Sequence, residues 1–310
     1  MSSVFRTVAY GKWILSGEHS VLRGQEAIVV PLFSKKLYFE FLPGSQIDGL
    51  RIHIEGSHSS DIESIVRALF SKAIEILELK KFNLSGDIRI QNEIPLGSGL
   101  GASSSLCVAF GRWFCSMNLI EPNKVYEFSR NLENLFHGES SGVDIAVVLN
   151  EKPLIFKRPQ SIEYIENYFK PHLYLSYSGQ RGVTKDCVEK VKKIFLVDPE
   201  KAQRLDQSMV ETTQLLKQAF IVSNEFNNSN AVNSDQNREK QMILGINNAY
   251  SIFQEWGLTR GAIDEHISSL KRMGALACKP TGSGGGGYVL SLWPRSMVPS
   301  EQTEFEFIPI

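Results

Sequence analysis

The 310-residue sequence lacks several features that would assign it to a class of proteins at once. It has no surplus of either charge, because 33 Lys and Arg residues stand against 34 Asp and Glu residues, for a net charge of −1. A protein without a basic surplus has no overall electrostatic attraction to nucleic acid or to an anionic membrane. No apolar run approaches the roughly 20 residues that a membrane-spanning helix requires. We therefore expect neither a nucleic-acid partner nor a membrane partner.

Cysteine is scarce as well, with four residues that are widely scattered and form no Cys-x-x-Cys pair. They are Cys107, Cys115, Cys187 and Cys278. This spacing is typical of buried thiols in a reducing compartment, and it disfavours a disulfide framework or a zinc site. The N-terminal segment 1–6 also lacks the apolar stretch of a signal peptide. We expect a cytoplasmic protein.

The most distinctive feature that is present is a Gly-rich loop at residues 95–104, called here the first Gly-rich loop. Residues 87–91 before it alternate like a half-buried strand, and apolar residues recur at helical spacing after it. The loop therefore joins a strand to a helix. Backbone N–H groups converge in such a loop, and the helix N-terminus adds positive partial charge, so phosphate is the most natural ligand.

Three other interpretations of this loop have to be weighed. It is not a Walker A loop, because no Gly-Lys-Ser/Thr follows the glycines. Gly97, Gly99 and Ala102 fit the loose dinucleotide-binding pattern, and Glu121 lies near the spacing of a ribose-binding acid. No predicted strand leads into Glu121, which disfavours that interpretation. A tight strand-to-helix turn without any ligand is the simplest alternative.

A second Gly-rich loop spans residues 279–287 and leads into the apolar stretch 288–292. Four consecutive glycines are costly in chain entropy, and a packed domain does not require them. Close approach of the backbone to a ligand, or closure over a ligand, would explain them. A flexible linker is disfavoured because apolar strands are predicted on both sides.

Polar residues also occur in unexpected apolar surroundings. Lys12, Glu18 and His19 lie in the largely apolar segment 11–22. They are either exposed groups on a hairpin or one wall of a substrate site, with a cation for an anionic group and two groups for hydroxyls. Asp144 follows a Gly-containing turn and precedes an apolar run, so it is either a turn former or a functional carboxylate at the edge of a cleft.

Periodicity predicts an alternation of strands and helices over most of the chain. The predicted strands are 4–10, 26–32, 36–42, 50–55, 173–176 and 288–292, and the clearest predicted helices are 62–77, 201–222, 242–256 and 263–273. The Asn- and Ser-rich segment 223–237 is predicted to be a mobile surface loop. The pattern loosens near residues 150–160, so we predict two domains, 1–158 and 159–310.

Three stretches together resemble the GHMP family of small-molecule kinases. Residues 11–24 contain Gly-Lys-x-Ile-Leu-x-Gly-Glu-His-x-Val, residues 95–101 read Pro-x-Gly-x-Gly-Leu-Gly, and residues 279–287 match the family's third motif. Within the family these stretches, and the His-Gly-x-x-Ser-Gly-x-Asp segment 137–144, are most similar to the mevalonate kinases. The resemblance implies an α+β fold of two lobes. The N-terminal lobe would have a mainly antiparallel sheet, and the C-terminal lobe would be ferredoxin-like.

The resemblance also implies a reaction and a set of roles. The reaction is transfer of a phosphoryl group from ATP to the primary hydroxyl of mevalonate, which gives 5-phosphomevalonate and ADP. Asp144 and Lys12 would be catalytic, and both would bind substrate together with Glu18 and His19. Ser103 and Glu133 would hold Mg²⁺, because Glu133 lies eleven residues before Asp144, as the family's magnesium carboxylate does. The ATP-binding residues would be Pro95, Leu96, Gly97, Ser98, Gly99, Leu100, Gly101, Ala102, Ser103, Ser104, Gly282 and Gly284.

The sequence departs from the family pattern at a few positions and leaves alternatives. Ala102 replaces the first serine of the family's hydroxyl pair, and Lys279-Pro280 also resembles the phosphomevalonate kinases. Phosphomevalonate kinase or another GHMP kinase is therefore the alternative enzyme, although Glu18-His19 argues against the former. The alternative outside enzymes is a nucleotide-binding sensor. A homodimer is compatible with the sequence.

Overall fold

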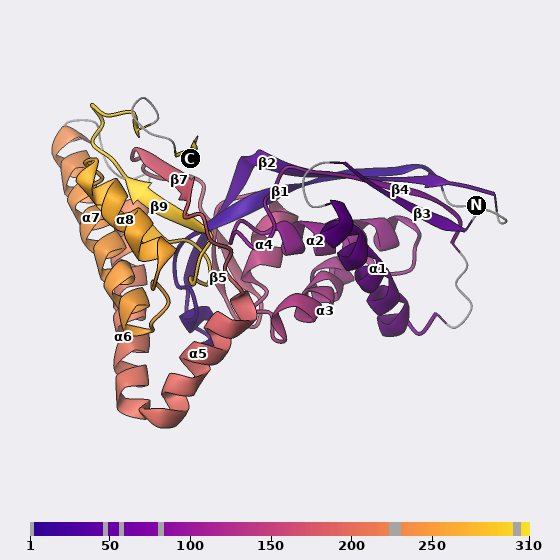
Figure 1. The fold of residues 1–310 in the computed structure, drawn as a ribbon, viewed down its shortest axis with the longest axis horizontal. Coiled ribbons are helices and arrows are strands. Elements are labelled where there is room, and N and C mark those ends of the chain that lie inside the picture. Colours follow the sequence, from indigo (N-terminus) through magenta and orange to yellow (C-terminus); the bar gives the residue numbers. More distant parts are fainter. Residues whose placement is uncertain (1–2, 46–48, 56–58, 80–83, 223–230, 300–304) are drawn as a thin grey trace. The chain divides into compact units, whose positions relative to one another are not determined.

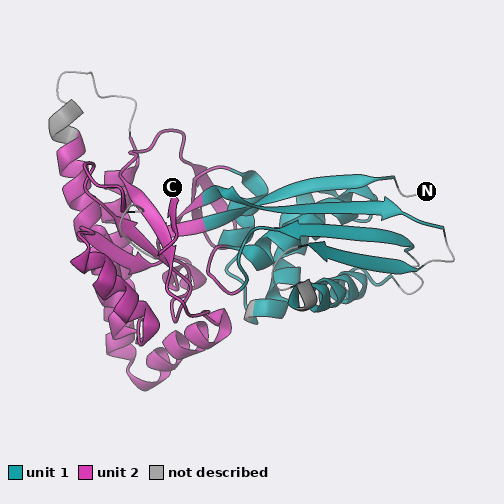
Figure 2. Ribbon diagram, turned by 45° about the horizontal axis from the view of Figure 1, so that its top comes forward, with its two compact units in different colours: residues 1–12, 31–96, 101–151 teal, residues 13–30, 97–100, 152–310 magenta. Residues whose placement is uncertain are grey.

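The computed structural model describes residues 3–45, 49–55, 59–79, 84–222, 231–299 and 305–310. The chain forms two compact units, shown in Figure 2. Unit 1 comprises residues 1–12, 31–96 and 101–151, and unit 2 comprises residues 13–30, 97–100 and 152–310. Both units are discontinuous in sequence, because the chain passes from one to the other several times. The contiguous division into 1–158 and 159–310 stays a prediction.

The strands of unit 1 form a mixed sheet. They are β3 (Leu50–Glu55), β4 (Gly86–Asn92), the first part of β1 (Phe5–Ser16) and residues 31–43 of β2 (Ala27–Pro43). β2 pairs antiparallel with β4, in a register that places Leu37 opposite Asn92, and β3 pairs parallel with β4. Side chains alternate between the two faces of a strand, so Phe39 and Phe41 both enter the core.

Four helices of unit 1 lie on one side of β3 and β4 (Figure 1). They are α1 (Ser59–Ile76), α2 (Ala102–Ser116), α3 (Val125–His137) and α4 (Val143–Asn150), and the short 3₁₀ helix η2 (Pro122–Lys124) precedes α3. Aromatic side chains fill the space between sheet and helices. The ring centroid of Trp113 on α2 lies 4.9 Å from that of Phe41 and 5.3 Å from that of Phe39. This aromatic core holds the C-terminal half of α2, and the first Gly-rich loop enters the same helix at its other end.

Unit 2 contains an antiparallel sheet of four strands in the order β10-β7-β9-β8. Its strands are β7 (Leu173–Tyr177), β8 (Ala277–Pro280), β9 (Tyr288–Leu292) and β10 (Phe307–Pro309). The helices are η1 (Ser20–Arg23), α5 (Thr184–Val197), α6 (Pro199–Phe220), α7 (Ala231–Glu255) and α8 (Ala262–Arg272). Figure 1 shows α6, α7 and α8 side by side along this sheet. Two further strands, β5 (Leu154–Lys157) and β6 (Ser161–Tyr164), form an antiparallel pair.

The predicted fold class is confirmed, since the chain is α+β and most strand pairs are antiparallel. Several local predictions need correction. The predicted strands 26–32 and 36–42 are one continuous strand, β2. β5 and β6 were not predicted, because strands of four residues are too short to show an alternation. Glu121 precedes η2 and follows no strand, so the dinucleotide pattern lacks its structural context.

The predicted surface loop 223–237 is wrong for its second half. Residues 231–237 form the start of α7, and residues 223–230 lie outside the described residues. The composition misled the prediction because a tertiary contact stabilises this end of the helix. Arg238 Nη1 donates hydrogen bonds to the carbonyls of Gln218, Ala219 and Ile221 at the C-terminal end of α6. A guanidinium at a helix C-terminus satisfies carbonyls that the helix itself leaves unpaired.

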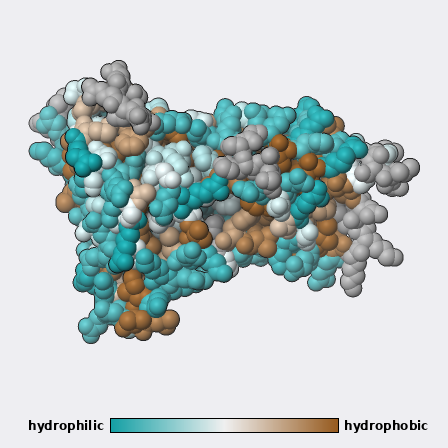
Figure 3. Space-filling model, in the orientation of Figure 1, coloured by the Kyte–Doolittle hydropathy of each residue, from teal (hydrophilic) through white to brown (hydrophobic). Residues whose placement is uncertain are grey.

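The surface is mostly hydrophilic on the face shown in Figure 3. An apolar spot at the α5–α6 corner includes Leu196 and Val197, which are 84% and 73% exposed. Every helix in the described part of the chain is too short or too polar to cross a bilayer. The four cysteines are free thiols; Cys107, Cys187 and Cys278 are buried as predicted, whereas Cys115 is half-buried.

Candidate active site

A lysine and an aspartate predicted to be catalytic lie in contact in unit 1. Lys12 Nζ on β1 is 2.9 Å from Asp144 Oδ2 in the first turn of α4. The lysine side chain is only 2% exposed, whereas the aspartate side chain is 23% exposed. Gly101, at the start of α2, makes room for this lysine, because a Cβ there would lie 2.8 Å from Lys12 Cγ. The glycine of the first Gly-rich loop therefore has a packing role as well as a conformational one.

The two oxygens of the Asp144 carboxylate have different surroundings. Oδ2 is held by the Lys12 ammonium, whereas Oδ1 accepts no hydrogen bond from any residue that the structure describes. The first turn of α4 also places the carboxylate at the positive end of a helix dipole, which favours an anion. A fixed carboxylate with one unused acceptor can take a proton from a hydroxyl group bound beside it.

A second carboxylate of unit 1, that of Glu133 on α3, is bound on both oxygens. Ser104 Oγ donates to Oε1, and Ser140 Oγ donates to Oε2. Glu133 is 2% exposed, and Ser140 Oγ also accepts a 3.0 Å hydrogen bond from Gly142 N. These contacts link α3 to the first turn of α2 and to the turn before α4. The sequence predicted that Ser103 and Glu133 together hold Mg²⁺, which stays a prediction; the contact of Ser104 with Glu133 was not predicted. Ser140 was missed.

The Glu133 carboxylate and the hydroxyls of Ser104 and Ser140 are oxygen donors, which suits Mg²⁺. Among the described residues no group of three or more His, Cys, Asp or Glu side chains could hold a metal by itself. Mg²⁺ binds proteins through one or two carboxylates and takes its other ligands from phosphate oxygens and water. The residues present therefore fit a magnesium ion that arrives with a nucleotide.

Replacing Glu133 with glutamine is expected to weaken binding of MgATP by about 10- to 100-fold, because the carboxylate charge and its hydroxyl network are lost. The measurement is calorimetric titration of ATP in the presence and absence of Mg²⁺. Glu127→Gln is the matched control, because Glu127 lies on the same helix and is exposed. Equal affinity of Glu133→Gln and Glu127→Gln for MgATP would exclude Glu133 from the magnesium site.

The two Gly-rich loops meet in unit 2, where residues 97–100 pack against the second loop. Tyr288 N donates a 3.0 Å hydrogen bond to Ser98 O. At Gly99 a Cβ would lie 2.6 Å from the carbonyl oxygen of Thr281, so only glycine fits between the two backbones. The two Gly-rich loops, which the sequence predicted separately, are thus in direct backbone contact within unit 2. Pro95, Leu96 and residues 101–104 belong to unit 1.

Glu18 lies inside unit 2, in a buried ion pair. Its Oε1 is 2.5 Å from Lys279 Nζ, and the two side chains are 2% and 0% exposed. Lys279 also donates a 3.2 Å hydrogen bond to the carbonyl of Ile14. The sequence pattern did not reveal Lys279 as the partner. In the structure, Lys279 lies on the short strand β8, and all four residues of that strand are buried.

His19 is also buried in unit 2, beside the second Gly-rich loop. Its Nε2 lies 2.9 Å from the carbonyl oxygen of Ser283. Burial lowers the pKa of His19 to about 4, so the imidazole is neutral near pH 7 and donates from Nε2. The predicted substrate-binding roles of Glu18 and His19 stay predictions, and the contacts observed for both are with the protein itself.

The buried state of His19 predicts a pH dependence of stability. The pKa is about 4 in the folded chain and near 6.5 when exposed, so the unfolded chain binds the extra proton first as the pH falls. The stabilisation is complete above about pH 6.5 and is lost between 6.5 and 4. We expect a loss of about 2 kcal/mol between pH 7 and pH 5 from this residue. Urea unfolding at pH 7 and pH 5 gives the free energy of unfolding at each pH. Between these pH values, His19→Phe should lose about 2 kcal/mol less of this free energy than the wild-type chain.

Comparison with known proteins places these residues in context. The family model described as the GHMP kinases N terminal domain matches residues 65–152, which include Glu133 and Asp144. A mevalonate kinase of Pyrococcus furiosus is 26% identical over 308 residues, covering 93% of this chain and 88% of the relative. A mevalonate kinase of Aeropyrum pernix is 25% identical, covering 96% and 91%.

Solved structures show the same fold. The L. major mevalonate kinase in complex with R-mevalonate has a TM-score of 0.73 at 22% identity, covering 94% of this chain and 88% of that one. The Methanococcus jannaschii mevalonate kinase has a TM-score of 0.72 at 17% identity, covering 99% and 98%. A Streptococcus pneumoniae phosphomevalonate kinase in complex with phosphomevalonate and AMPPNP has a TM-score of 0.67 at 17% identity, covering 93% and 92%.

Proposed function

We propose that this chain, a small-molecule kinase of the GHMP type, transfers the γ-phosphoryl group of ATP to the primary hydroxyl of mevalonate. The observation that carries the proposal is the pair Lys12 and Asp144, a fixed carboxylate with one unused acceptor beside a buried ammonium. Similarity to mevalonate kinases over more than nine-tenths of the chain supports the choice of acceptor. The products would be 5-phosphomevalonate and ADP.

Asp144 would act on the acceptor hydroxyl. As the hydroxyl oxygen forms its bond to the γ-phosphorus, the bond from that phosphorus to the β,γ-bridging oxygen breaks and ADP leaves. The hydroxyl proton passes to the carboxylate of Asp144, whose side chain is 23% exposed. Lys12 keeps the carboxylate in place and stabilises negative charge on the attacking oxygen. Phosphoryl transfer depends mainly on such positioning and charge neutralisation.

The Gly-rich loops would bind the phosphates of ATP. Backbone N–H groups of the first loop, at the start of α2, provide donors and a helix N-terminus. Mg²⁺, when bound, neutralises charge on the β- and γ-phosphates. Glu133, with Ser103 and Ser104 at hand on α2, would hold the ion from the protein side.

Phosphomevalonate kinase is the weaker alternative. Its substrate carries a phosphate, which requires additional free cations in the acceptor site. Lys279, the residue that suggested this alternative, is fully buried and paired with Glu18. It is therefore not available to bind a substrate phosphate. A non-catalytic sensor is disfavoured for another reason, since a protein that only binds nucleotide needs no proton acceptor such as Asp144.

The remaining expectations belong to the same proposal. We propose Mg²⁺ as the metal that accompanies ATP, on the oxygen donors around Glu133. A cytoplasmic location, the absence of nucleic-acid and membrane partners, and a homodimer stay predictions from the sequence. None of them changes the chemistry proposed for Lys12 and Asp144.

Release of ADP in a coupled assay tests the proposal. The acceptors are mevalonate, phosphomevalonate, diphosphomevalonate, homoserine and galactose, each with ATP and Mg²⁺. We expect saturable turnover with mevalonate alone. Turnover with another acceptor would keep the kinase and change its substrate, and ATP binding without turnover on any acceptor would favour the sensor.

A further inference from the structure

The second Gly-rich loop has three successive carbonyl groups bound by side chains of unit 2. His19 Nε2 lies 2.9 Å from the carbonyl oxygen of Ser283. Cys187 Sγ donates to the carbonyl of Gly284 at 3.3 Å, and Gln180 Nε2 donates to the carbonyl of Gly285 at 3.2 Å. The three donors come from three separate segments: the turn before η1, helix α5, and the loop after β7. We call this arrangement the carbonyl clasp.

The carbonyl clasp fixes the direction of the loop's N–H groups. In a planar trans peptide the carbonyl and the N–H of the next residue point in opposite directions. The peptides bound at Ser283 and Gly285 therefore turn the N–H groups of Gly284 and Gly286 away from His19 and Gln180. Neither N–H donates to any acceptor in the part of the chain that the structure describes. Backbone N–H groups are strong donors, and such a pair in a Gly-rich turn is suited to an anion.

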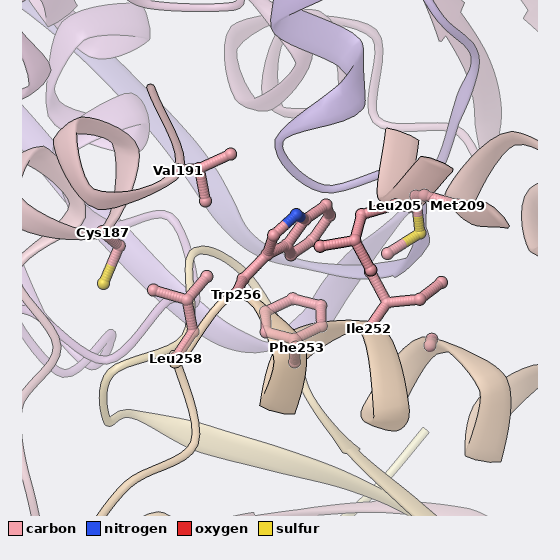
Figure 4. Close-up of a cluster of buried hydrophobic side chains, with 9 residues drawn as sticks. Cys187, Val191, Leu205, Met209, Ile252, Phe253, Trp256 and Leu258 are labelled. Atoms are coloured by element: carbon pink, nitrogen blue, oxygen red, sulfur yellow. The ribbon is translucent and has the colours of Figure 1, made fainter. Parts of the chain in front are cut away.

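The clasp is itself held in place by the hydrophobic cluster of unit 2. Figure 4 shows Cys187, Phe253 and Trp256 as members of one buried group. The His19 ring lies edge-on to both aromatic rings, with centroids 5.1 Å from Trp256 and 6.0 Å from Phe253. A ring packed on two sides keeps its Nε2 aimed at one carbonyl. His19 is thus fixed by a rigid core, as a positioning group has to be.

We propose that His19 is a positioning residue for the phosphate-binding loop. It acts through the Ser283 carbonyl, and with Gln180 at the Gly285 carbonyl it holds the N–H groups of Gly284 and Gly286 toward a nucleotide phosphate. Cys187 fixes the peptide between them, whose Gly285 N–H donates to the carbonyl of Leu258. The identity of the anion rests on the proposed kinase function. The role differs from the one the sequence pattern predicts, in which His19 contacts the acceptor substrate. The two roles affect different ligands.

A pair of substitutions separates the hydrogen bond of His19 from its ring. His19→Phe keeps an aromatic ring against Trp256 and removes the donor, whereas His19→Gln removes the ring and keeps an N–H donor of similar reach. The Kd of MgATP is measured by calorimetry without any acceptor, and KM for mevalonate is measured separately. We expect about a 10-fold weaker Kd in His19→Phe and at most about a threefold change in His19→Gln. KM for mevalonate should stay within about twofold in both.

His266→Phe is the matched control, because His266 is a buried histidine of unit 2 that bonds Ser176 outside the loop. It should leave the Kd of MgATP unchanged, and thermal unfolding checks that each variant folds. If His19→Phe does not fold, Cys187→Ala tests the same clasp and should weaken MgATP binding about two- to threefold.

Two results would overturn the proposal. One is an unchanged Kd for MgATP in His19→Phe, whether or not KM for mevalonate is raised, and the other is an unchanged Kd in Cys187→Ala. Failure of the proposed function looks different. The wild-type chain would then bind MgATP without phosphorylating mevalonate, and the Kd comparison among the variants would still decide the role of His19.

Discussion

Replacing Asp144 with asparagine is expected to lower kcat with mevalonate by about 10²- to 10⁴-fold, the range typical for loss of a general base. Asparagine keeps the size of the side chain and one oxygen, but it cannot take a proton from the acceptor hydroxyl. It also leaves the buried Lys12 ammonium without its counter-charge. Steady-state kinetics give kcat, and calorimetry gives the Kd of MgATP, which should change by less than about threefold because Asp144 is not assigned to ATP.

The control for this substitution is Asp61→Asn. Asp61 also lies in the first turn of a helix of unit 1, α1, and is exposed. It should leave both kcat and the Kd of MgATP unchanged. If Asp144→Asn instead turns over at the wild-type rate, the proton acceptor is another group and the proposed role of Lys12 must also be reconsidered.

Replacing Lys279 with methionine is expected to destabilise the protein by about 3–5 kcal/mol, the cost of leaving a buried charge without its partner. Lys279 is fully buried, and its ammonium is the cation bound to the Glu18 carboxylate inside unit 2. Methionine fills a similar volume, so the loss reflects charge more than packing. Urea unfolding of the full chain gives the difference in the free energy of unfolding.

Two further variants separate charge from shape. Lys271→Met removes an exposed lysine on α8 that lies 4.7 Å from the Tyr250 ring centroid, and it should cost less than about 1 kcal/mol. The double variant Glu18→Gln/Lys279→Met removes both charges and should be more stable than Lys279→Met alone. A double variant as unstable as the sum of the two single variants would show that the ion pair is not the cause.

The sequence revealed the glycine positions because glycine has few substitutes where two backbones touch. Gly99 and Gly101 illustrate this, since a Cβ would collide with Thr281 in one case and with Lys12 in the other. A pattern of such glycines therefore predicts a close approach to the backbone, which Gly99 and Gly101 show, whereas the phosphate-binding role of the loop stays a prediction. The position of Asp144, between a glycine turn and an apolar helix, left a turn former and a functional carboxylate open, and only the tertiary structure shows its contact with Lys12.

Contacts between distant segments could not be predicted in the same way. Glu18 and Lys279 are 261 residues apart, and nothing in either local pattern indicates that they form an ion pair. The same holds for His19 and the carbonyl of Ser283, since a backbone acceptor leaves no trace in the sequence. Polar residues in apolar surroundings identify a buried network, but only the tertiary structure shows whether its partner is a substrate or the protein.

The serines around Glu133 show a third limit. Ser103 and Ser104 are adjacent in the first turn of α2, and a rotation of 100° per residue separates their directions. The sequence pattern assigns Ser103 to Mg²⁺, which stays a prediction, and it did not indicate that the hydroxyl of Ser104 donates to Glu133. Ser140 comes from a turn without helical or strand periodicity, so no periodic pattern could have marked it.

The most direct test of the proposed reaction follows the transferred phosphoryl group itself. The purified chain is incubated with mevalonate, Mg²⁺ and ATP labelled at the γ-phosphate, and the products are separated and identified by mass spectrometry. We expect one labelled product, 5-phosphomevalonate, formed in equal amount to ADP and formed at least about 100-fold more slowly with Asp144→Asn. Label found only in inorganic phosphate, or transferred to phosphomevalonate and never to mevalonate, would contradict it.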